Sequence, residues 1–256
     1  MRVHCQEIDL KRKGDHFQGM AATQKLFDDL APRWWDDTGP FAPLHRLNPV
    51  RVRYVQQQAA CQNGRPLQEA LRHLNILDVG CGGGLLCEPM ARLGARVMGI
   101  DAAPEAIVTA QKHAAGEGLE IDYRRIDLAA LAQQKKQFDV ITAMEVIEHV
   151  DDAHQFVRQL AAVLRPNGVV IFSTLNRTMK SLWLGKIAAE YVLGLVPRGT
   201  HDWKKFVKPS ELMAMAEGAG LAPHDISGLI MNPITGDFSV NPADVSINYF
   251  AAFGWV

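Results

Sequence analysis

The sequence predicts an α/β fold in which a mostly parallel sheet carries helices on both faces. Three observations support this prediction. Strand-like and helix-like segments alternate from residue 76 onward, glycines stand where the helices should end, and a glycine-rich turn follows the first strand. Such alternation is typical of βαβ units. Because ligands of these sheets bind at the carboxyl ends of the strands, the first turn is the expected binding site.

The periodicity of apolar residues gives the individual elements. The expected strands are 76–80, 96–101, 121–127, 138–144, 168–175, 224–231 and 245–253. The helices between them are expected at 84–93, 104–115, 151–164 and 209–218. Further upstream, helical patterns are present at 21–36, 50–60 and 66–73. One glycine and three prolines should break up the segment 33–49.

Length and composition indicate one globular domain without a strong electrostatic field. The chain has 256 residues, 48% of them apolar, and a net charge of −1. We expect residues 21–256 to form this domain and residues 1–20 to be a disordered extension. The charge balance argues against nucleic acid as a partner. Four cysteines without paired spacing fit a reduced, cytoplasmic compartment, and no apolar stretch reaches the roughly 18 residues of a spanning helix.

The turn after the first strand, NILDVGCGGG, has an unusual glycine spacing. Asp78, Gly80, Gly82 and Gly84 alternate, whereas a dinucleotide fingerprint would need its third glycine at Leu85. A leading carboxylate would also repel a pyrophosphate, which argues against a nicotinamide-dependent dehydrogenase. It suits a cationic ligand, whose ammonium group can donate hydrogen bonds to Asp78. The motif resembles the first motif of class I S-adenosylmethionine-dependent methyltransferases.

Three further residues stand at the ends of the next strands. Asp101 ends the second strand about twenty positions after the first glycine, where a carboxylate accepts hydrogen bonds from two ribose hydroxyls. Asp127 ends the third strand and either meets an adenine amino group or is a solvated turn residue. Met144 ends the fourth strand, and its thioether is expected to pack on the adenine or the sulfonium region.

Glu145, Glu148 and His149 follow the fourth strand at i, i+3, i+4 spacing, so one helical turn would bring them together. Two carboxylates and an imidazole can hold a hard divalent cation. Alternatively, His149 accepts a proton as a general base. A third reading is purely structural, since acidic residues stabilise the N-terminus of a helix.

Seven longer stretches carry a more specific signal than the glycine turn. They are RWWD (33–36), FAPLHRLNPVRVRYV (41–55), LDVGCGGGLLCEPMARLGA (77–95), MEVIEHV (144–150), FSTLNRT (172–178), VPRGTHDWKKFVKPSEL (196–212) and NPITGDF (232–238). Together they resemble the ubiquinone-biosynthesis O-methyltransferases over about residues 21–250. The resemblance implies a class I, Rossmann-like fold whose seven-stranded, mostly parallel sheet ends in an antiparallel strand. The pattern of strands and helices adds an N-terminal helical cap (21–65) and a helical insertion after the fifth strand (176–204).

The resemblance also implies site residues. Arg51, Gly80, Asp101 and Met144 would contact S-adenosylmethionine, with Gly82 in the same loop, and a guanidinium at Arg51 suits the cofactor's carboxylate. Some members depend on a divalent cation such as Mg²⁺, which suits Glu145, Glu148 and His149 as ligands. With or without metal, His149 and Glu145 are the expected catalytic residues.

The expected acceptor is a polyprenylated catechol or hydroquinone, methylated at two steps of the pathway. Residues 181–197 form an apolar stripe with basic flanks, which suits either an interfacial helix on anionic lipid or a lid packed on the core. Trp34 and Trp35 would close the other side of the acceptor site, although buried aromatic side chains there need no function. We therefore expect an enzyme bound peripherally to the cytoplasmic face of the inner membrane, within reach of a quinone-biosynthesis complex. The alternative is a cofactor-binding scaffold of such a complex that does not catalyse.

Overall fold

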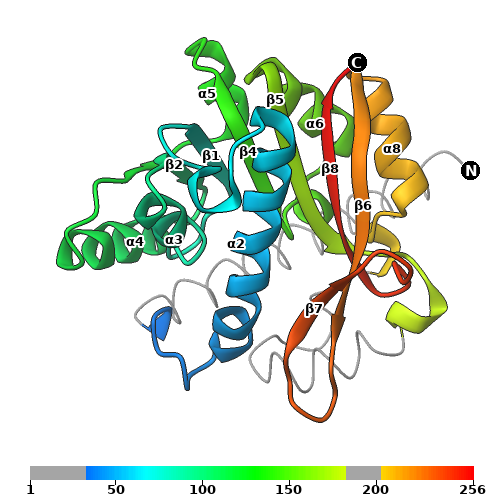
Figure 1. Ribbon diagram of the computed structural model, residues 1–256, viewed down its shortest axis with the longest axis horizontal. Helices are drawn as coiled ribbons and strands as arrows, with labels where there is room; N and C mark the ends of the chain where they lie inside the picture. Colours follow the sequence, from blue (N-terminus) through cyan, green and yellow to red (C-terminus); the bar gives the residue numbers. More distant parts are fainter. Residues whose placement is uncertain (1–32, 183–202) are drawn as a thin grey trace, which may run out of the picture.

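The computed structural model describes residues 33–182 and 203–256, which form a sheet of eight strands in the order β3-β2-β1-β4-β5-β8-β6-β7 (Figure 1). The strands are β1 (Asn75–Val79), β2 (Arg96–Asp101), β3 (Asp122–Arg125), β4 (Phe138–Met144), β5 (Leu164–Leu175), β6 (Leu221–Met231), β7 (Phe238–Asn241) and β8 (Asn248–Trp255). Strands β1 to β5 are parallel, whereas β8 is antiparallel to both β5 and β6, and β7 to β6.

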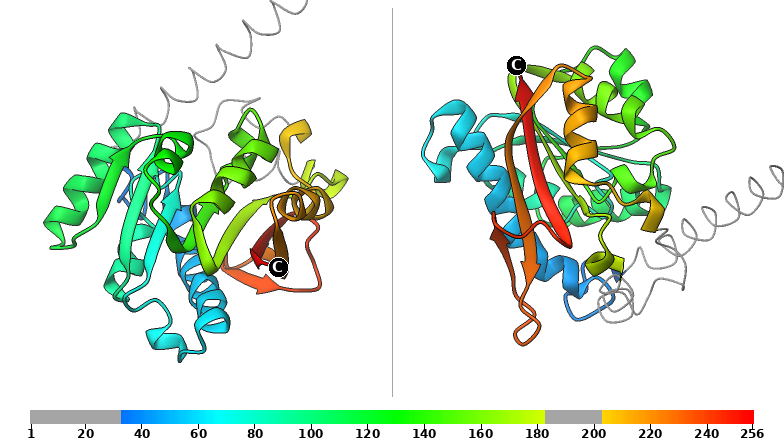
Figure 2. Two further views of the ribbon diagram at one scale, coloured as in Figure 1. Left: turned by 90° about the horizontal axis from the view of Figure 1, so that it is seen from above. Right: turned by 90° about the vertical axis from the view of Figure 1, so that its right-hand side faces the viewer.

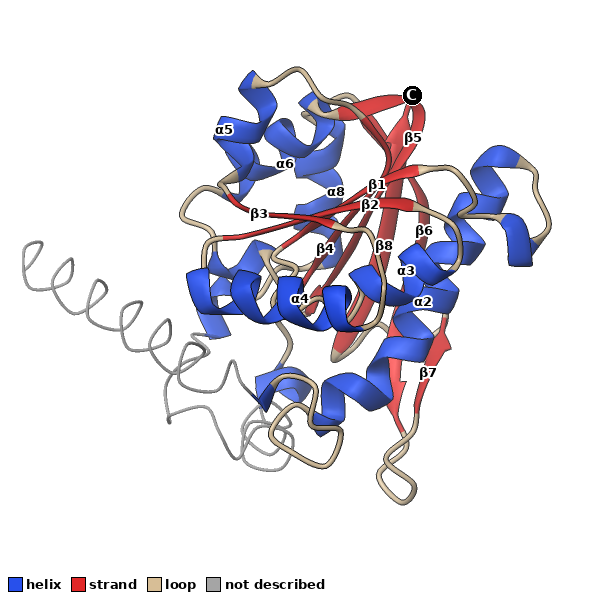
Figure 3. Cartoon of the chain, turned by 90° about the vertical axis from the view of Figure 1, so that its left-hand side faces the viewer, coloured by secondary structure: helices blue, strands red, loops and turns tan. Residues whose placement is uncertain are grey.

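Helices cover both faces of the sheet (Figures 2 and 3). One face carries α2 (Ala42–Asn63), α3 (Cys87–Arg92) and α4 (Pro104–Gly116), and the other carries α5 (Leu128–Gln133), α6 (Ala153–Ala162) and α8 (Pro209–Glu217). Consecutive residues of β5 enter different cores, because side chains alternate along a strand. Val169 and Ile171 pack under α2, whereas Val170 and Phe172 pack under α6 and α8.

The α/β class and the antiparallel last strand are confirmed, but the predicted strand count of seven is wrong. The additional strand is β7, which pairs with the end of β6 through a hairpin. With four residues it is too short to show a period in the sequence. Residues 128–133 are likewise helical in the structure, although no helical period of ten or more residues is present there.

The prediction of a broken segment over 33–49 is confirmed up to Phe41, where the chain forms turns, but it is wrong from Ala42 onward. Helix α2 runs without interruption over 22 residues, with Pro43 in its first turn and Pro49 inside it. Proline in the first turn loses no hydrogen bond, and burial of Tyr54 and Val55 stabilises the helix around the internal proline. Conversely, the helix expected over 66–73 is only a short 3₁₀ turn at Leu67–Glu69.

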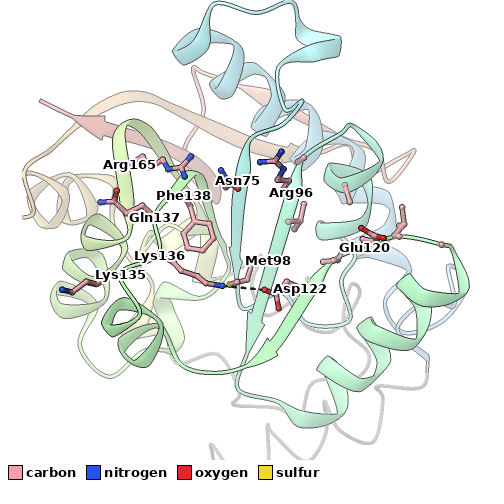
Figure 4. Close-up of a pocket in the computed structure, with 16 residues that line it drawn as sticks. Asn75, Arg96, Met98, Glu120, Asp122, Lys135, Lys136, Gln137, Phe138 and Arg165 are labelled. Atoms are coloured by element: carbon pink, nitrogen blue, oxygen red, sulfur yellow. Dashed lines mark ion pairs between the residues drawn. The ribbon is translucent and has the colours of Figure 1, made fainter.

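The sheet has a hollow at the edge opposite to the expected site. A volume of about 1060 Å³ is lined by the first residues of four parallel strands, Asn75, Arg96, Asp122 and Phe138, among others (Figure 4). Ligands of open α/β sheets bind at the carboxyl ends of the strands, so we do not assign this hollow to the cofactor.

Several predictions lie outside the described residues: the extension 1–20, the helical pattern before residue 33 and most of the insertion after β5. In the parts of the chain that the structure describes, no helix is long and apolar enough to cross a membrane.

Candidate active site

The carboxyl ends of β1, β2 and β4 bring the predicted cofactor residues to one edge of the sheet. In the register, Val79 lies between Ile100 of β2 and Ala143 of β4. The next residues along these strands are therefore neighbours: Gly80, Asp101 and Met144. The strand order reverses between β1 and β4: β2 and β3 follow on one side, and β5 follows on the other. A ligand site is expected at such a point.

The glycine loop has a backbone conformation that glycine adopts more readily than other residues. Gly80, Gly82 and Gly84 have φ angles of 73°, 52° and 90°, a region that residues with side chains rarely adopt. The amide of Gly82 donates to Oδ2 of Asp101 over 2.9 Å, and the amide of Ala103 donates to Oδ1 over 2.8 Å. Asp101 therefore links the loop after β1 to the start of α4 and keeps its carboxylate at the site.

Because the glycines have no side chains, Val146 and Trp34 can pack directly against the loop. A Cβ on Gly80 would lie 2.5 Å from a methyl group of Val146. On Gly82 and Gly83 it would lie 2.3 Å and 2.2 Å from the indole of Trp34, which packs directly on this backbone. The sequence predicts Trp34 at the acceptor side, and nothing in its local pattern places it on the glycines.

Asp78 lies beneath the loop, where it contacts protein donors. Its carboxylate accepts from the hydroxyl of Thr142 over 2.6 Å and from the thiol of Cys87 over 3.2 Å. Burial raises the pKa of Asp78 to about 6, against the effect of these two hydrogen bonds. In this structure Asp78 connects β1, β4 and α3, and its expected contact with the cofactor's ammonium group stays a prediction.

Arg51 reaches the site from α2 and is buried there. It forms an ion pair with Glu145, whose other carboxylate oxygen accepts from the hydroxyl of Ser173 over 2.9 Å. Glu145 has a φ of 56°, which is strained for a residue with a side chain. The Nε of Arg51 is buried and has no hydrogen-bond partner among the described residues. This N–H group can therefore donate a hydrogen bond to a bound ligand.

Glu148 points to the other face of the sheet. It accepts from the hydroxyl of Thr174 over 2.9 Å, while Glu145 binds the preceding residue, Ser173. Consecutive residues of a strand face opposite sides, so the two carboxylates are held on opposite sides of β5. Burial raises the pKa of Glu148 to about 7.

The predicted three-ligand metal set, Glu145, Glu148 and His149, is not assembled. Only a short 3₁₀ turn, Ile147–His149, follows β4, in place of the expected α-helical turn. Across residues 33–182 and 203–256, no group of three His, Cys, Asp or Glu side chains could hold a metal ion. The two carboxylates are engaged elsewhere, while His149 is exposed.

The remaining two predicted residues have different surroundings. Met144 is buried at the end of β4 in the same core cluster as Cys81, next to the glycine loop. Asp127 is exposed and caps α5, accepting from the amide of Ala130 over 2.7 Å. Asp127 therefore has the turn role that the sequence analysis kept open, and a contact with adenine stays a prediction.

The site fits S-adenosylmethionine in its donor and acceptor chemistry. The unpartnered Nε of Arg51 suits the cofactor's carboxylate, and the carboxylate of Asp101 suits ribose hydroxyls. Met144, at the end of β4, supplies a polarisable apolar surface beside the glycine loop.

The fold and this edge of the sheet define a class I S-adenosylmethionine-dependent methyltransferase. A family model described as a methyltransferase domain matches residues 52–226. Among solved structures, a magnesium protoporphyrin IX methyltransferase from Synechocystis PCC 6803 with bound S-adenosylhomocysteine has the same fold. It superimposes with a TM-score of 0.55 at 20% identity, covering 81% of this chain and 85% of its own.

More similar relatives narrow the family. The chain is 47% identical to the ubiquinone biosynthesis O-methyltransferase of Dinoroseobacter shibae, covering 88% of this chain and 92% of the relative. It is 46% identical to the enzyme of that name from Methylobacterium nodulans, covering 88% and 91%. The chain belongs to the ubiquinone biosynthesis O-methyltransferase family, as the sequence predicted. These relatives are named as methyltransferases, which favours an enzyme over a scaffold.

Proposed function

We propose that the protein transfers methyl groups from S-adenosylmethionine to hydroxyls of a polyprenylated catechol or hydroquinone, at both O-methylation steps of ubiquinone biosynthesis. The names of its relatives support the pathway. The convergence of Arg51, the glycine loop and Asp101 at one sheet edge carries the assignment at the level of residues.

The cofactor lies across the carboxyl ends of β1, β2 and β4 in this proposal. Arg51 binds its carboxylate, Gly80 and Gly82 allow its close approach, Asp101 accepts from its ribose, and Met144 packs against it. Bound there, S-adenosylmethionine supplies a sulfonium methyl group for in-line displacement. The chain's own task is to align the acceptor oxygen and keep water away.

His149 is the proposed general base. A phenolic hydroxyl has a pKa near 10, so at neutral pH it needs a nearby acceptor to become a good nucleophile. The imidazole is exposed at the end of the turn that follows β4, five residues after Met144, and is thus accessible to an incoming acceptor. Glu145 has a separate role, which is to orient Arg51.

A polyprenylated acceptor is dissolved in membrane, so the proposal includes peripheral binding to an anionic cytoplasmic leaflet of the inner membrane. The apolar, basic-flanked stripe within 181–197 supports this part. Sedimentation with vesicles tests it: the full chain should bind anionic vesicles more than neutral ones, and W183D should weaken binding. Equal binding of both proteins would contradict the role of the stripe. Contact with other enzymes of the pathway is proposed on the same grounds.

The central experiment combines binding and turnover. D101N should weaken S-adenosylhomocysteine binding, measured by calorimetry, by roughly tenfold or more, because it removes a charged acceptor of two hydrogen bonds. H149A should keep that binding but lower kcat for a catechol by roughly a hundredfold or more. Unchanged binding in D101N would refute the cofactor site, and full activity in H149A would refute the base.

A further experiment with a chelator tests whether turnover needs a divalent cation. The expected ligand set is not assembled, so we route no step through a metal. Turnover is compared after chelation and after addition of Mg²⁺. If chelation abolishes turnover of the wild type, a ligand set different from the one predicted must act.

A further inference from the structure

Residues 34 and 35 hold the glycine loop from a second segment of the chain. The indole of Trp34 packs on Gly82 and Gly83, and Nε1 of Trp35 donates to the carbonyl oxygen of Gly83 over 3.0 Å. The backbone carbonyl of Trp34 is in turn bound by the imidazole of His45 on α2, over 2.9 Å. The loop is therefore fixed by the tryptophan pair as well as by Asp101.

Trp35 is itself held by a histidine from α4. Its ring is parallel to that of His113, with an interplanar angle of 1° and centroids 3.6 Å apart. Nδ1 of His113 lies 2.7 Å from Oε1 of Glu88, and the second oxygen of Glu88 accepts from Arg92 over 3.2 Å. Glu88 is only 1% exposed, so this carboxylate is a fixed point within the core.

These contacts form a continuous chain from the core to the cofactor loop. Buried Glu88 orients the imidazole of His113, the imidazole supports the indole of Trp35, and the indole binds the backbone of Gly83. The chain consists of two polar contacts, one of them to a buried carboxylate, and of the contact between the two parallel rings.

We propose that His113 is a positioning residue that prepares the glycine loop for the cofactor through Trp35. The inference rests on the proposed binding of S-adenosylmethionine at this loop and adds a residue that supports the binding site. A loop rich in glycine has much conformational freedom to lose, and a loop ordered in advance loses less on binding. His113 should therefore affect cofactor affinity and leave the transfer step unchanged, since it does not touch the reacting groups.

The test is a variant that keeps the partner of Glu88 but lacks the ring. H113Q retains a hydrogen-bond donor for the buried carboxylate and removes the stacking surface. We expect the KM for S-adenosylmethionine and the Kd for S-adenosylhomocysteine to rise roughly three- to tenfold. We expect kcat and Tm to stay near the wild-type values. H154Q, on the exposed surface of α6, is the matched control and should change none of these quantities.

A second variant separates the stack from the hydrogen bond. W35F keeps a ring for His113 but cannot donate to Gly83, and it should weaken cofactor binding as well. Because His113 acts on the loop only through Trp35, the double variant should bind little worse than W35F alone, which a double-mutant cycle measures. Additive losses would overturn the proposal, as would unchanged affinity in H113Q or a loss of Tm and kcat at unchanged affinity.

These outcomes are distinct from a failure of the proposed cofactor site. If the cofactor does not bind at the glycine loop, D101N and H113Q both leave S-adenosylhomocysteine binding intact. If only the positioning role is wrong, D101N weakens binding and H113Q does not.

Discussion

The glycine loop after β1 and the segment 145–149 after β4 lie at the same edge of the sheet, yet they differ in how they are built. The loop depends on backbone conformation, and the alternating Gly80, Gly82 and Gly84 all have positive φ angles. The second segment depends on side-chain direction, and there the predicted cluster is not formed. Residue spacing along the chain therefore predicts the conformation of a glycine loop far better than it predicts whether separate side chains meet at one point.

The physical reason lies in the neighbouring strand. Ser173 and Thr174 are consecutive in β5, and each donates to one of the two carboxylates, Glu145 and Glu148. The alternation of the strand separates them, although their spacing in the sequence would place them on one helical face. Nothing within residues 145–149 contains this information.

The largest expected effect is at the loop itself. G82A would place a methyl group 2.3 Å from the Trp34 indole at a φ of 52°. We expect the free energy of unfolding to fall by about 1–3 kcal/mol and affinity for S-adenosylhomocysteine to fall roughly ten- to a hundredfold. Calorimetry and denaturant titration measure both. G116A is the control, because a Cβ there has nothing within 4 Å. Wild-type affinity in G82A would mean that the loop does not need its conformation.

The second prediction concerns the ion pair at the site. E145Q removes the charge that orients Arg51, so affinity for S-adenosylhomocysteine should fall roughly three- to tenfold. E69Q, at an exposed carboxylate away from this edge, should leave the affinity unchanged. A higher affinity in E145Q would instead show that Glu145 competes with the cofactor for Arg51.

The third prediction uses the buried carboxyl on the opposite face. The pKa of Glu148 is about 7 in the folded protein, raised by burial from an ordinary value of 4.5. Between these values the folded state binds more protons than the unfolded state, so this group makes stability fall as pH rises. Its share is fully lost above pH 7. In E148Q the free energy of unfolding should therefore decline less between pH 5 and pH 8.

Denaturant titrations at the two pH values measure this difference. Asp78 also has a pKa raised by burial, to about 6, but it is present in both proteins and cancels in the comparison. Parallel declines in wild type and E148Q would show that Glu148 does not titrate in this range.

The smallest effect is expected at Asp127. D127A removes the cap of α5 and should lower the free energy of unfolding by about 1 kcal/mol. If capping is its whole role, affinity for S-adenosylhomocysteine stays at the wild-type value, in contrast to D101N. A clear loss of affinity would show that Asp127 also meets the adenine.

Much of the fold was predictable because it depends on local patterns. The bounds of β2 and β4 agree with the prediction to the residue, since both strands are apolar runs between clear turn signals. Strand β7 and helix α5 were missed because they are too short to show a period. Helix α2 was interrupted in the prediction because Pro49 disfavours a helix locally, and burial against the sheet overrides that preference.

The sequence by itself determined the α/β class, the glycine loop, the carboxylate of Asp101 beside it and the family, because each of these follows from local patterns and motifs along the chain. Only the tertiary structure decided what those glycines contact, which is the Trp34 indole, and that Glu145 and Glu148 are held on opposite sides of β5. It also revealed the chain of contacts from Glu88 through His113 to Trp35. These contacts join segments tens of residues apart, and their geometry depends on how whole strands and helices pack.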